Sequence, residues 1–372
     1  TDPINDDNIT FEFGFTISDH GSTSEVQTFK VTVNDSVPLA DDHELIVYED
    51  NSLQFVLSDG AFKDGKIKID NNDGNGFKEY STNDTVKIYE GSKEVGTIKI
   101  LEGGKLEFKP VEDYSKYDAS DKNKLPNFKY QVSDTDGDYA EGTIKIQVKP
   151  VADAPTIKVN DVTSYEDAST YSDLTTGNKA EGGNKIPLGL LVPSLSTDQK
   201  DKNNATGDSP ERNGEITLNF TAFTNGQNIK DAELYNGNKK VADIENGTEI
   251  KIVIVDNTGQ VDKNYHHDNV TLGQANTLYL TESEYESLKI QHAEDNDTDI
   301  KITIKVTSYE VDDNGKPLFK NDDYADNNNS NLKKDSSANM IVVIKPVTDN
   351  IELKFDTNTV NGEILGTISP DG

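Results

Sequence analysis

The chain places acidic residues at repeated positions around one kind of β-hairpin and the segment that follows it. Between Gln131 and Val159, a turn with three alternating aspartates precedes an alternating strand, and Asp153 follows that strand. Carboxylate oxygens at this density are the hard ligands that Ca²⁺ prefers, usually about six to eight at a time. We therefore predict that calcium binds where these acidic residues converge.

The predicted metal ligands fall into three sets, one for each place where one β-module gives way to the next. The first set is Asp19, Asp35, Glu49 and Asp50; the second is Asp134, Asp136, Asp138, Asp153, Glu166 and Asp167; the third is Asp312, Asp313 and Asp349. Carboxylates that converge at one seam would repel one another unless a cation neutralised them. The alternative for the turns alone is that Asp and Gly simply make good hairpin turns. An EF-hand is excluded because Lys145 stands where that loop needs Glu.

Internal repeats support this grouping. An ungapped offset of 115 residues aligns Ser18-Asp19 with Ser133-Asp134 and the strand TFKVTV with TIKIQV. Two further motifs recur downstream, Tyr48-Glu49-Asp50 as Tyr165-Glu166-Asp167 and Lys149-Pro150-Val151 as Lys345-Pro346-Val347. Repeats of this length indicate successive copies of one structural unit.

The pattern of short alternating segments predicts an all-β fold built from tandem Ig-like or cadherin-like β-sandwiches in a linear array. Runs such as KLEFKP, TIKIQV, EITLNF and DIKITIKV alternate apolar and polar residues, and Asp-Gly or Asn-Gly pairs separate them. The repeats place the expected boundaries as follows: residues 1–35 are the closing hairpin of a truncated module, 36–151 a complete sandwich, 152–347 a larger sandwich, and 348–372 the start of a further truncated module.

The larger module carries three polar insertions, at residues 171–212, 256–269 and 308–338. Long loops on a β-scaffold are either functional or disordered. Their concentration in one module makes residues 152–347 the candidate for a dedicated glycan- or protein-binding domain. One short helix is expected at Thr281–Leu288, with Thr281 as N-cap and Glu284 completing a capping box.

The composition excludes several classes of function. A balance of 36 Lys and Arg against 68 Asp and Glu leaves −32 charges, which argues against a nucleic-acid partner. The chain has no Cys, so disulfides and thiolate chemistry are absent, and no apolar run is long enough to insert in a membrane. No catalytic motif is present, so no enzyme is expected. The pair His266-His267 beside Asp268 lacks a third zinc ligand, and neighbouring strand residues point to opposite faces.

Three stretches carry a family resemblance: LEFKPVEDYSKYDASDKNKLPNFKYQVSDTDGDYAEGTIKIQV, PVADAPTIKVNDVTSYEDAS and LYLTESEYESLKIQHAEDNDTDIKITIKVTSYE. The first resembles the closing half of cadherin-like bacterial repeats. The other two are similar to module junctions and repeats of giant RTX (repeats-in-toxin) adhesins, which type I systems secrete. The resemblance implies a calcium-stiffened extracellular arm on a bacterial cell surface, acting in adhesion and biofilm formation and packing against neighbouring modules. A structural surface-layer or filament subunit is a further alternative.

Overall fold

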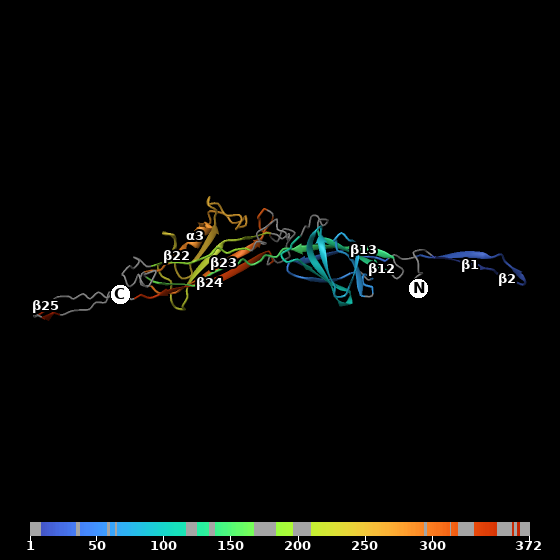
Figure 1. The fold of residues 1–372 in the computed structure, drawn as a ribbon, viewed down its shortest axis with the longest axis horizontal. Helices are drawn as coiled ribbons and strands as arrows, with labels where there is room; N and C mark the ends of the chain where they lie inside the picture. Colours follow the sequence, from blue (N-terminus) through green and yellow to red (C-terminus); the bar gives the residue numbers. More distant parts are fainter. Residues whose placement is uncertain are drawn as a thin grey trace. The chain divides into compact units, whose positions relative to one another are not determined.

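The fold was obtained as a computed structural model, shown in Figure 1. It describes residues 9–34, 38–57, 60–63, 65–116, 125–133, 138–166, 184–195, 210–293, 296–312, 314–318, 331–347, 359–360 and 363–364. The chain forms two compact units. The first comprises Thr1–Asp153, Thr197–Glu211 and Glu310–Lys333, and the second comprises Ala154–Ser196, Arg212–Tyr309 and Lys334–Gly372. Parts of two polar insertions of the expected larger module therefore belong to the first unit.

The first unit begins with a two-stranded ribbon (Figure 1). Strand β1 (Ile9–Phe15) pairs antiparallel with β4 (Gln27–Val33), and the short strands β2 (Ser18–Asp19) and β3 (Ser22–Thr23) pair near its turn. This is the hairpin that the repeat analysis expects within residues 1–35.

Two facing sheets form the sandwich of the first unit. One has the order β6-β11-β10-β9 and the other the order β5-β13-β12-β7-β8. Their strands are β5 (His43–Tyr48), β6 (Leu53–Val56), β7 (Lys66–Asp70), β8 (Lys78–Ser81), β9 (Thr85–Glu90), β10 (Lys93–Ile100), β11 (Lys105–Pro110), β12 (Asn127–Ser133) and β13 (Tyr139–Lys149). A 3-10 turn, η1 (Glu102–Gly104), joins β10 to β11.

The alternation seen in the sequence is the alternation of buried and exposed side chains. In β11, for example, Leu106 and Phe108 are fully buried while the lysines beside them are exposed. Side chains from both sheets form one core cluster. The first strand, β5, pairs parallel with the last, β13, from His43 opposite Ile144 to Tyr48 opposite Lys149. This parallel pair decides where the ends of the module meet.

The second unit repeats the plan with a larger sheet. One sheet has the order β14-β24-β23-β17-β20-β21, with β16 also paired to β23, and faces a sheet of order β15-β22-β18-β19. Its strands are β14 (Val162–Tyr165), β15 (Lys185–Pro187), β16 (Glu211–Asn213), β17 (Ile216–Ala222), β18 (Ala232–Asn236), β19 (Lys239–Ile244), β20 (Glu249–Ile254), β21 (Thr277–Leu280), β22 (Leu288–Gln291), β23 (Ile300–Glu310) and β24 (Lys333–Lys345); two short strands, β25 (Thr359–Val360) and β26 (Glu363–Ile364), pair near the C-terminus. First and last strands again pair in parallel, β14 with β24. The all-β tandem Ig-like prediction is confirmed.

The predicted helix is also confirmed, as α3 (Glu282–Glu286). The Thr281 hydroxyl accepts a hydrogen bond from the Glu284 backbone N–H at 3.3 Å, and the Glu284 carboxylate accepts one from the Thr281 N–H at 2.8 Å. Tyr285 on this helix is fully buried in the core.

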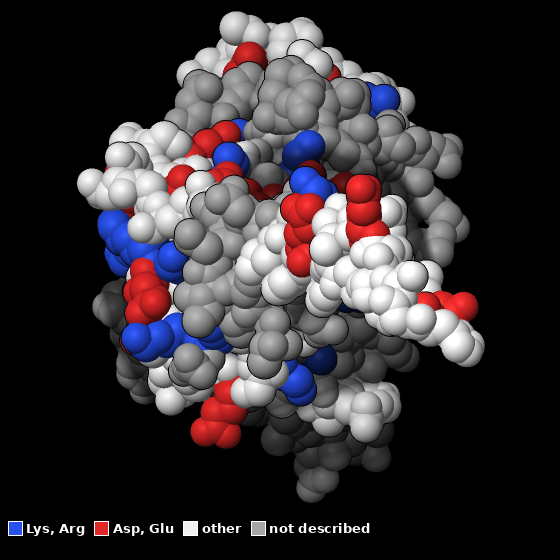
Figure 2. All heavy atoms as spheres, turned by 90° about the vertical axis from the view of Figure 1, so that its right-hand side faces the viewer, with Lys and Arg blue, Asp and Glu red and all other residues white. Residues whose placement is uncertain are grey.

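The acidic surface is not uniform. On the face drawn in Figure 2, Lys and Arg side chains lie among the Asp and Glu side chains. Among the described residues, no helix is long and apolar enough to cross a membrane.

Candidate metal centre

Three aspartates of the first unit bring their carboxylates together. Oxygens of Asp50, Asp113 and Asp153 all lie within 4.8 Å of one another. Asp50 is exposed, and the other two are half-buried. Two of the three, Asp50 and Asp153, are predicted metal ligands; Asp113 is not.

The strand topology explains the meeting of residues so distant in sequence. Because β5 and β13 run parallel, both strands end at the same edge of the sandwich, where Tyr48 lies opposite Lys149. Asp50 follows the first of these strands and Asp153 follows the second. Asp113 follows β11 of the facing sheet. Asp50 and Asp113 both have left-handed backbones, with φ of 60° and 51°, a conformation that Asp tolerates better than most residues.

A buried glutamate fastens this edge. Glu49 is 2 % exposed, and its carboxylate accepts a hydrogen bond from the backbone N–H of Val151. Its own N–H donates to the Lys149 carbonyl at 3.0 Å. Further along, the Asp153 N–H donates to the buried carboxylate of Glu211 at 2.7 Å. The segment that leaves β13 is thus held by hydrogen bonds from the backbone N–H groups of Val151 and Asp153.

The donor set suits a hard divalent cation. Three carboxylates supply oxygen ligands of the type that calcium binds. At 4.8 Å and an effective dielectric constant of ~20, each pair of ionised carboxylates repels by about 3 kcal/mol. Asp50 also lines a hollow of about 640 Å³ with Glu94, Lys109 and Glu112. The residues therefore fit the ion that the sequence predicts.

The grouping of ligands differs from the expected one. The sequence assigns Glu49 and Asp50 to one seam and Asp153 to the next, but Asp50 and Asp153 share one cluster. The prediction that the Asp134–Asp138 turn converges with Asp153 is wrong for the described member, Asp138. Asp138 precedes β13 and Asp153 follows it, so an 11-residue strand of about 35 Å separates them.

The positions of the strands also correct the third predicted set of ligands, to which Asp312 belongs. Asp312 follows β23 and lies beside the start of β24, whereas the expected seam follows the end of β24, a strand of 13 residues. The Asp312 carboxylate accepts hydrogen bonds from the N–H groups of Asn314 and Lys316, both at 2.9 Å. Asp312 therefore stabilises its own turn. Asp19 is exposed near the turn of the first hairpin and forms a hydrogen bond with His20.

Six predicted ligands lie outside the described residues: Asp35, Asp134, Asp136, Asp167, Asp313 and Asp349. In the second unit, Glu166 repeats the arrangement of Glu49. It is 5 % exposed, and its carboxylate accepts a hydrogen bond from the Val347 N–H at 2.5 Å. The Glu of the repeated Tyr-Glu-Asp motif thus has a structural function in both units.

The histidine pair serves the fold of the second unit. His266 is 1 % exposed; its Nε2 accepts a hydrogen bond from the Ile254 N–H at 2.8 Å, and its Nδ1 lies 3.3 Å from the Asn213 carbonyl. His267 packs edge-on against Tyr309. Burial lowers the pKa of His266 and of His267 to about 4. Both rings are therefore neutral at pH 7, and His266 has no ring nitrogen left for zinc.

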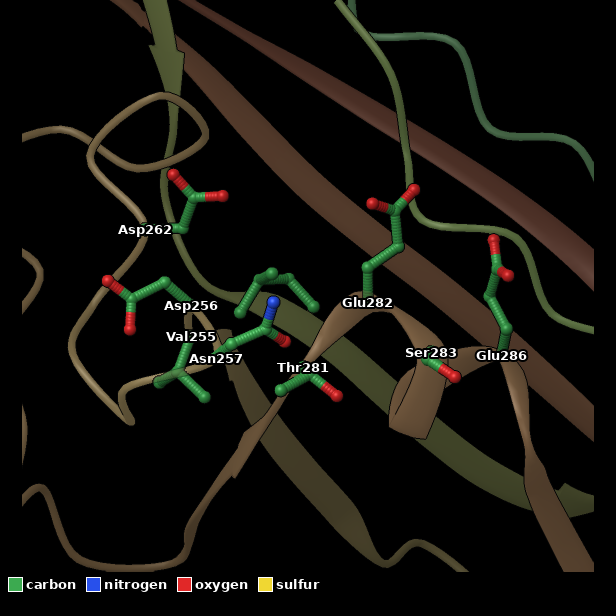
Figure 3. Close-up of a pocket in the computed structure, with 9 residues that line it drawn as sticks. Val255, Asp256, Asn257, Asp262, Thr281, Glu282, Ser283 and Glu286 are labelled. Carbon is green, nitrogen blue, oxygen red and sulfur yellow. The ribbon is translucent and has the colours of Figure 1, made fainter.

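A second acidic site lies in the second unit (Figure 3). A cavity of about 450 Å³ is lined by Ile254, Val255, Asp256, Asn257, Asp262, Thr281, Glu282, Ser283 and Glu286. Its two sides come from the 256–269 insertion and from helix α3, as Figure 3 shows. The Asp256 pKa is lowered by hydrogen bonds, chiefly from the Thr258 hydroxyl. The lining residues include four carboxylates and no cationic side chain.

Asp113 is not among the predicted ligands because it lies neither in a hairpin turn nor at a module junction. Asp113 belongs to the run VEDY, which directly follows the strand KLEFKP. The available signal was the position of an Asp-Tyr pair just after a strand of the opposite sheet. Only the pairing of β5 with β13 shows which strand ends share that edge.

The comparisons with known proteins concern the fold. No protein family and no curated protein matches the sequence. Among solved structures, murine CEACAM1b is 11% identical with a TM-score of 0.18, covering 71% of this chain and 90% of that one. The N-terminal eight Ig domains of Down Syndrome Cell Adhesion Molecule are 10% identical with a TM-score of 0.20, covering 86% and 32%. Titin domains z1z2, solved in complex with telethonin, are 8% identical with a TM-score of 0.21, covering 85% and 100%.

Proposed function

We propose that the chain is a calcium-stiffened, non-enzymatic segment of a bacterial cell-surface adhesin, working outside the cell as an extender between other parts of that protein. The observation that carries this proposal is the Asp50–Asp113–Asp153 cluster at the edge where the chain leaves the first sandwich. A cation held there would tie a loop of each sheet to the segment that leads onward.

The cluster also explains how rigidity would depend on location. Extracellular modules bind calcium at about 10⁻⁴ to 10⁻³ M, far above the free calcium of a cell interior. Without the ion, mutual repulsion of the three carboxylates would loosen the edge. With the ion, the same carboxylates would become its ligands. The negative charge of −32 would in addition keep neighbouring copies apart.

The test is thermal unfolding of the full chain in EDTA and in excess calcium. At ~100 times its Kd, a ligand adds about 2.7 kcal/mol of stability, and we expect the melting temperature of the first unit to rise on the order of 10 °C. Asp113→Asn should remove most of that rise. The readout is the difference between the two conditions, because in EDTA the same substitution relieves repulsion and also changes the contacts that Asp113 itself makes.

The matched control is Glu102→Gln, which removes one carboxylate from the exposed η1 turn of the same unit. It should leave the calcium-dependent rise intact. Equal melting temperatures with calcium and with EDTA would contradict the proposal, and so would equal effects of the two substitutions.

A second candidate function follows from the acidic cavity in Figure 3. Because Asp256, Asp262, Glu282 and Glu286 line it and none of its lining residues is cationic, the cavity suits a positively charged group on a protein ligand. An arginine-rich peptide is the probe. Glu282→Gln with Glu286→Gln should weaken its binding to the full chain. Glu245→Gln with Glu249→Gln, an equal change of charge at exposed sites of the same unit, should not.

A further inference from the structure

The ribbon formed by β1 and β4 has one apolar face open to solvent. Phe11, Phe13 and Phe15 of β1 are 49 %, 48 % and 47 % exposed. Opposite them on β4, Phe29 and Val31 are 51 % and 41 % exposed. The rings form a continuous row, with Phe13 stacked on Phe29 at a centroid distance of 5.2 Å. Exposed apolar surface of this extent marks an interaction site.

The opposite face of the same ribbon is polar. Thr10 pairs with Thr32 and Glu12 with Lys30 across the two strands. The Glu12 carboxylate lies 3.7 Å from the Lys30 ammonium group. One apolar and one polar face is the pattern of an antiparallel hairpin that covers a core on one side only. A two-stranded ribbon alone is marginally stable.

The chain itself shows what covers such a face. Hairpin β12–β13 is related to β1–β4 by the offset of 115 residues, and the strand register agrees: Phe13 opposite Phe29 corresponds to Phe128 opposite Ile144. Phe128 and Ile144 are both 0% exposed. There, β5 flanks the hairpin parallel to β13, β7 flanks it antiparallel to β12, and the facing sheet covers the apolar face.

We infer that β1–β4 is an acceptor surface for the opening strand of an Ig-like module. The occupant is an extended segment with apolar side chains at alternate positions, which adds parallel to the free edge of β4. The register of β5 on β13 places it opposite Phe29 to Val33. This inference does not depend on calcium.

A second copy of the chain fits the ribbon less well. Two ribbons stacked through their phenylalanines would still leave the free edges of β4 unpaired. The charge of −32 on each chain also opposes self-association. The opening strands of a module satisfy both needs, because the first pairs with the edge, as β5 does, and the next lies in the sheet that covers the face, as β6 does.

The ribbon lacks one contact that fixes the strand register in hairpin β12–β13. There, the Tyr130 hydroxyl donates to the Asp41 carbonyl at 2.8 Å, and its ring passes so close to Gly142 that an added Cβ would lie 2.4 Å from it. The corresponding residues of the ribbon are Phe15 and Gln27. Phe15 has no hydroxyl, so apolar contacts alone must set the register of the incoming strand.

The experiment uses the full chain in EDTA with a synthetic peptide of residues 41–57, which spans β5 and β6. Amide hydrogen exchange resolved by NMR is the measurement. We expect exchange at Phe29 to Val33 to slow by ~10-fold or more when the peptide pairs with the edge. Phe29→Asp should abolish the effect. Thr32→Asp, on the polar face of the same strand, should preserve it.

A fused chain serves as a second probe, because a free peptide can aggregate. Residues 36–122 joined ahead of Asn8 supply the opening strands in the same chain, at the spacing that the 115-residue offset prescribes. The ribbon amides should then be protected like those of β12. Absence of protection with both probes would overturn the inference. Protection that appears without either probe and grows with protein concentration would also overturn it, in favour of a second copy.

Discussion

The two sandwiches are closed by the same device but carry different polar residues at their edges. In each, a buried glutamate after the first strand accepts a hydrogen bond from the valine two residues after the last strand, Glu49 from Val151 and Glu166 from Val347. A lysine also lies over a tyrosine ring in each, 5.7 Å from the centroid in both units. Both units therefore share the parallel pairing of their first and last strands and the buried glutamate that follows the first strand.

What differs is the chemistry added to that frame. The first unit gathers three carboxylates at the closed edge, whereas the second buries three imidazoles, two of them within its 256–269 insertion. On the proposed function, the first arrangement responds to calcium, whereas the buried imidazoles of the second become unfavourable in acid. The comparison teaches that repeats of one fold can depend on different solution conditions for stability.

The largest expected effect is acid destabilisation of the second unit. The native pKa of His266 and of His267 is about 4, below the ordinary value of 6.5. The unfolded chain therefore binds protons first as pH falls, so stability present above pH 6.5 is lost between about 6.5 and 4. The loss should be on the order of 3 kcal/mol for each histidine.

The methyl group of Met340 can report this loss. It is the single methionine of the chain and lies in the core of the second unit at 1% exposure, so its NMR signal follows that unit alone. Urea midpoints from this signal should fall between pH 7 and pH 4.5. The double variant His266→Gln, His267→Gln should show a much flatter dependence; an equally steep one would contradict the assignment.

The next largest effect concerns the buried glutamate that both units contain. Glu49→Ala leaves the Val151 N–H without its carboxylate, and Glu166→Ala does the same to Val347. Each should destabilise its own unit by about 2 to 4 kcal/mol in EDTA. Glu→Gln at the same sites keeps an acceptor and should cost less. The Met340 signal should respond to the Glu166 variant and not to the Glu49 variant. A response to both would show that the units unfold together.

The smallest effect concerns the helix that only the second unit contains among the described residues. Thr281→Ala removes the capping box of α3 and should destabilise the second unit by about 1 kcal/mol. Thr281→Ser should restore most of the loss. Thr277→Ala, which removes another threonine hydroxyl of the same unit, is the control for deletion alone. Equal urea midpoints for Thr281→Ala and the parent chain would contradict a stabilising cap.

Local patterns determined much of this fold. Alternation of apolar and polar residues located the strands, because side chains of a strand point to opposite faces and only one face is buried. The Thr281–Glu284 spacing located a helix cap for an equally local reason. The repeated Tyr-Glu-Asp and Lys-Pro-Val motifs identified the ends of the modules, although not that they bond to each other.

The composition of the acidic cluster was decided by tertiary structure alone. Sequence placed Asp50 and Asp153 at different seams and left Asp113 out, because a list of strands does not state their direction or partners. Parallel pairing of β5 with β13 brings two strand ends to one edge, and the facing sheet adds Asp113 there. The same pairing sends the Asp138 turn to the far end of an 11-residue strand. Strand identity is local, but strand partnership is set by burial of the whole core.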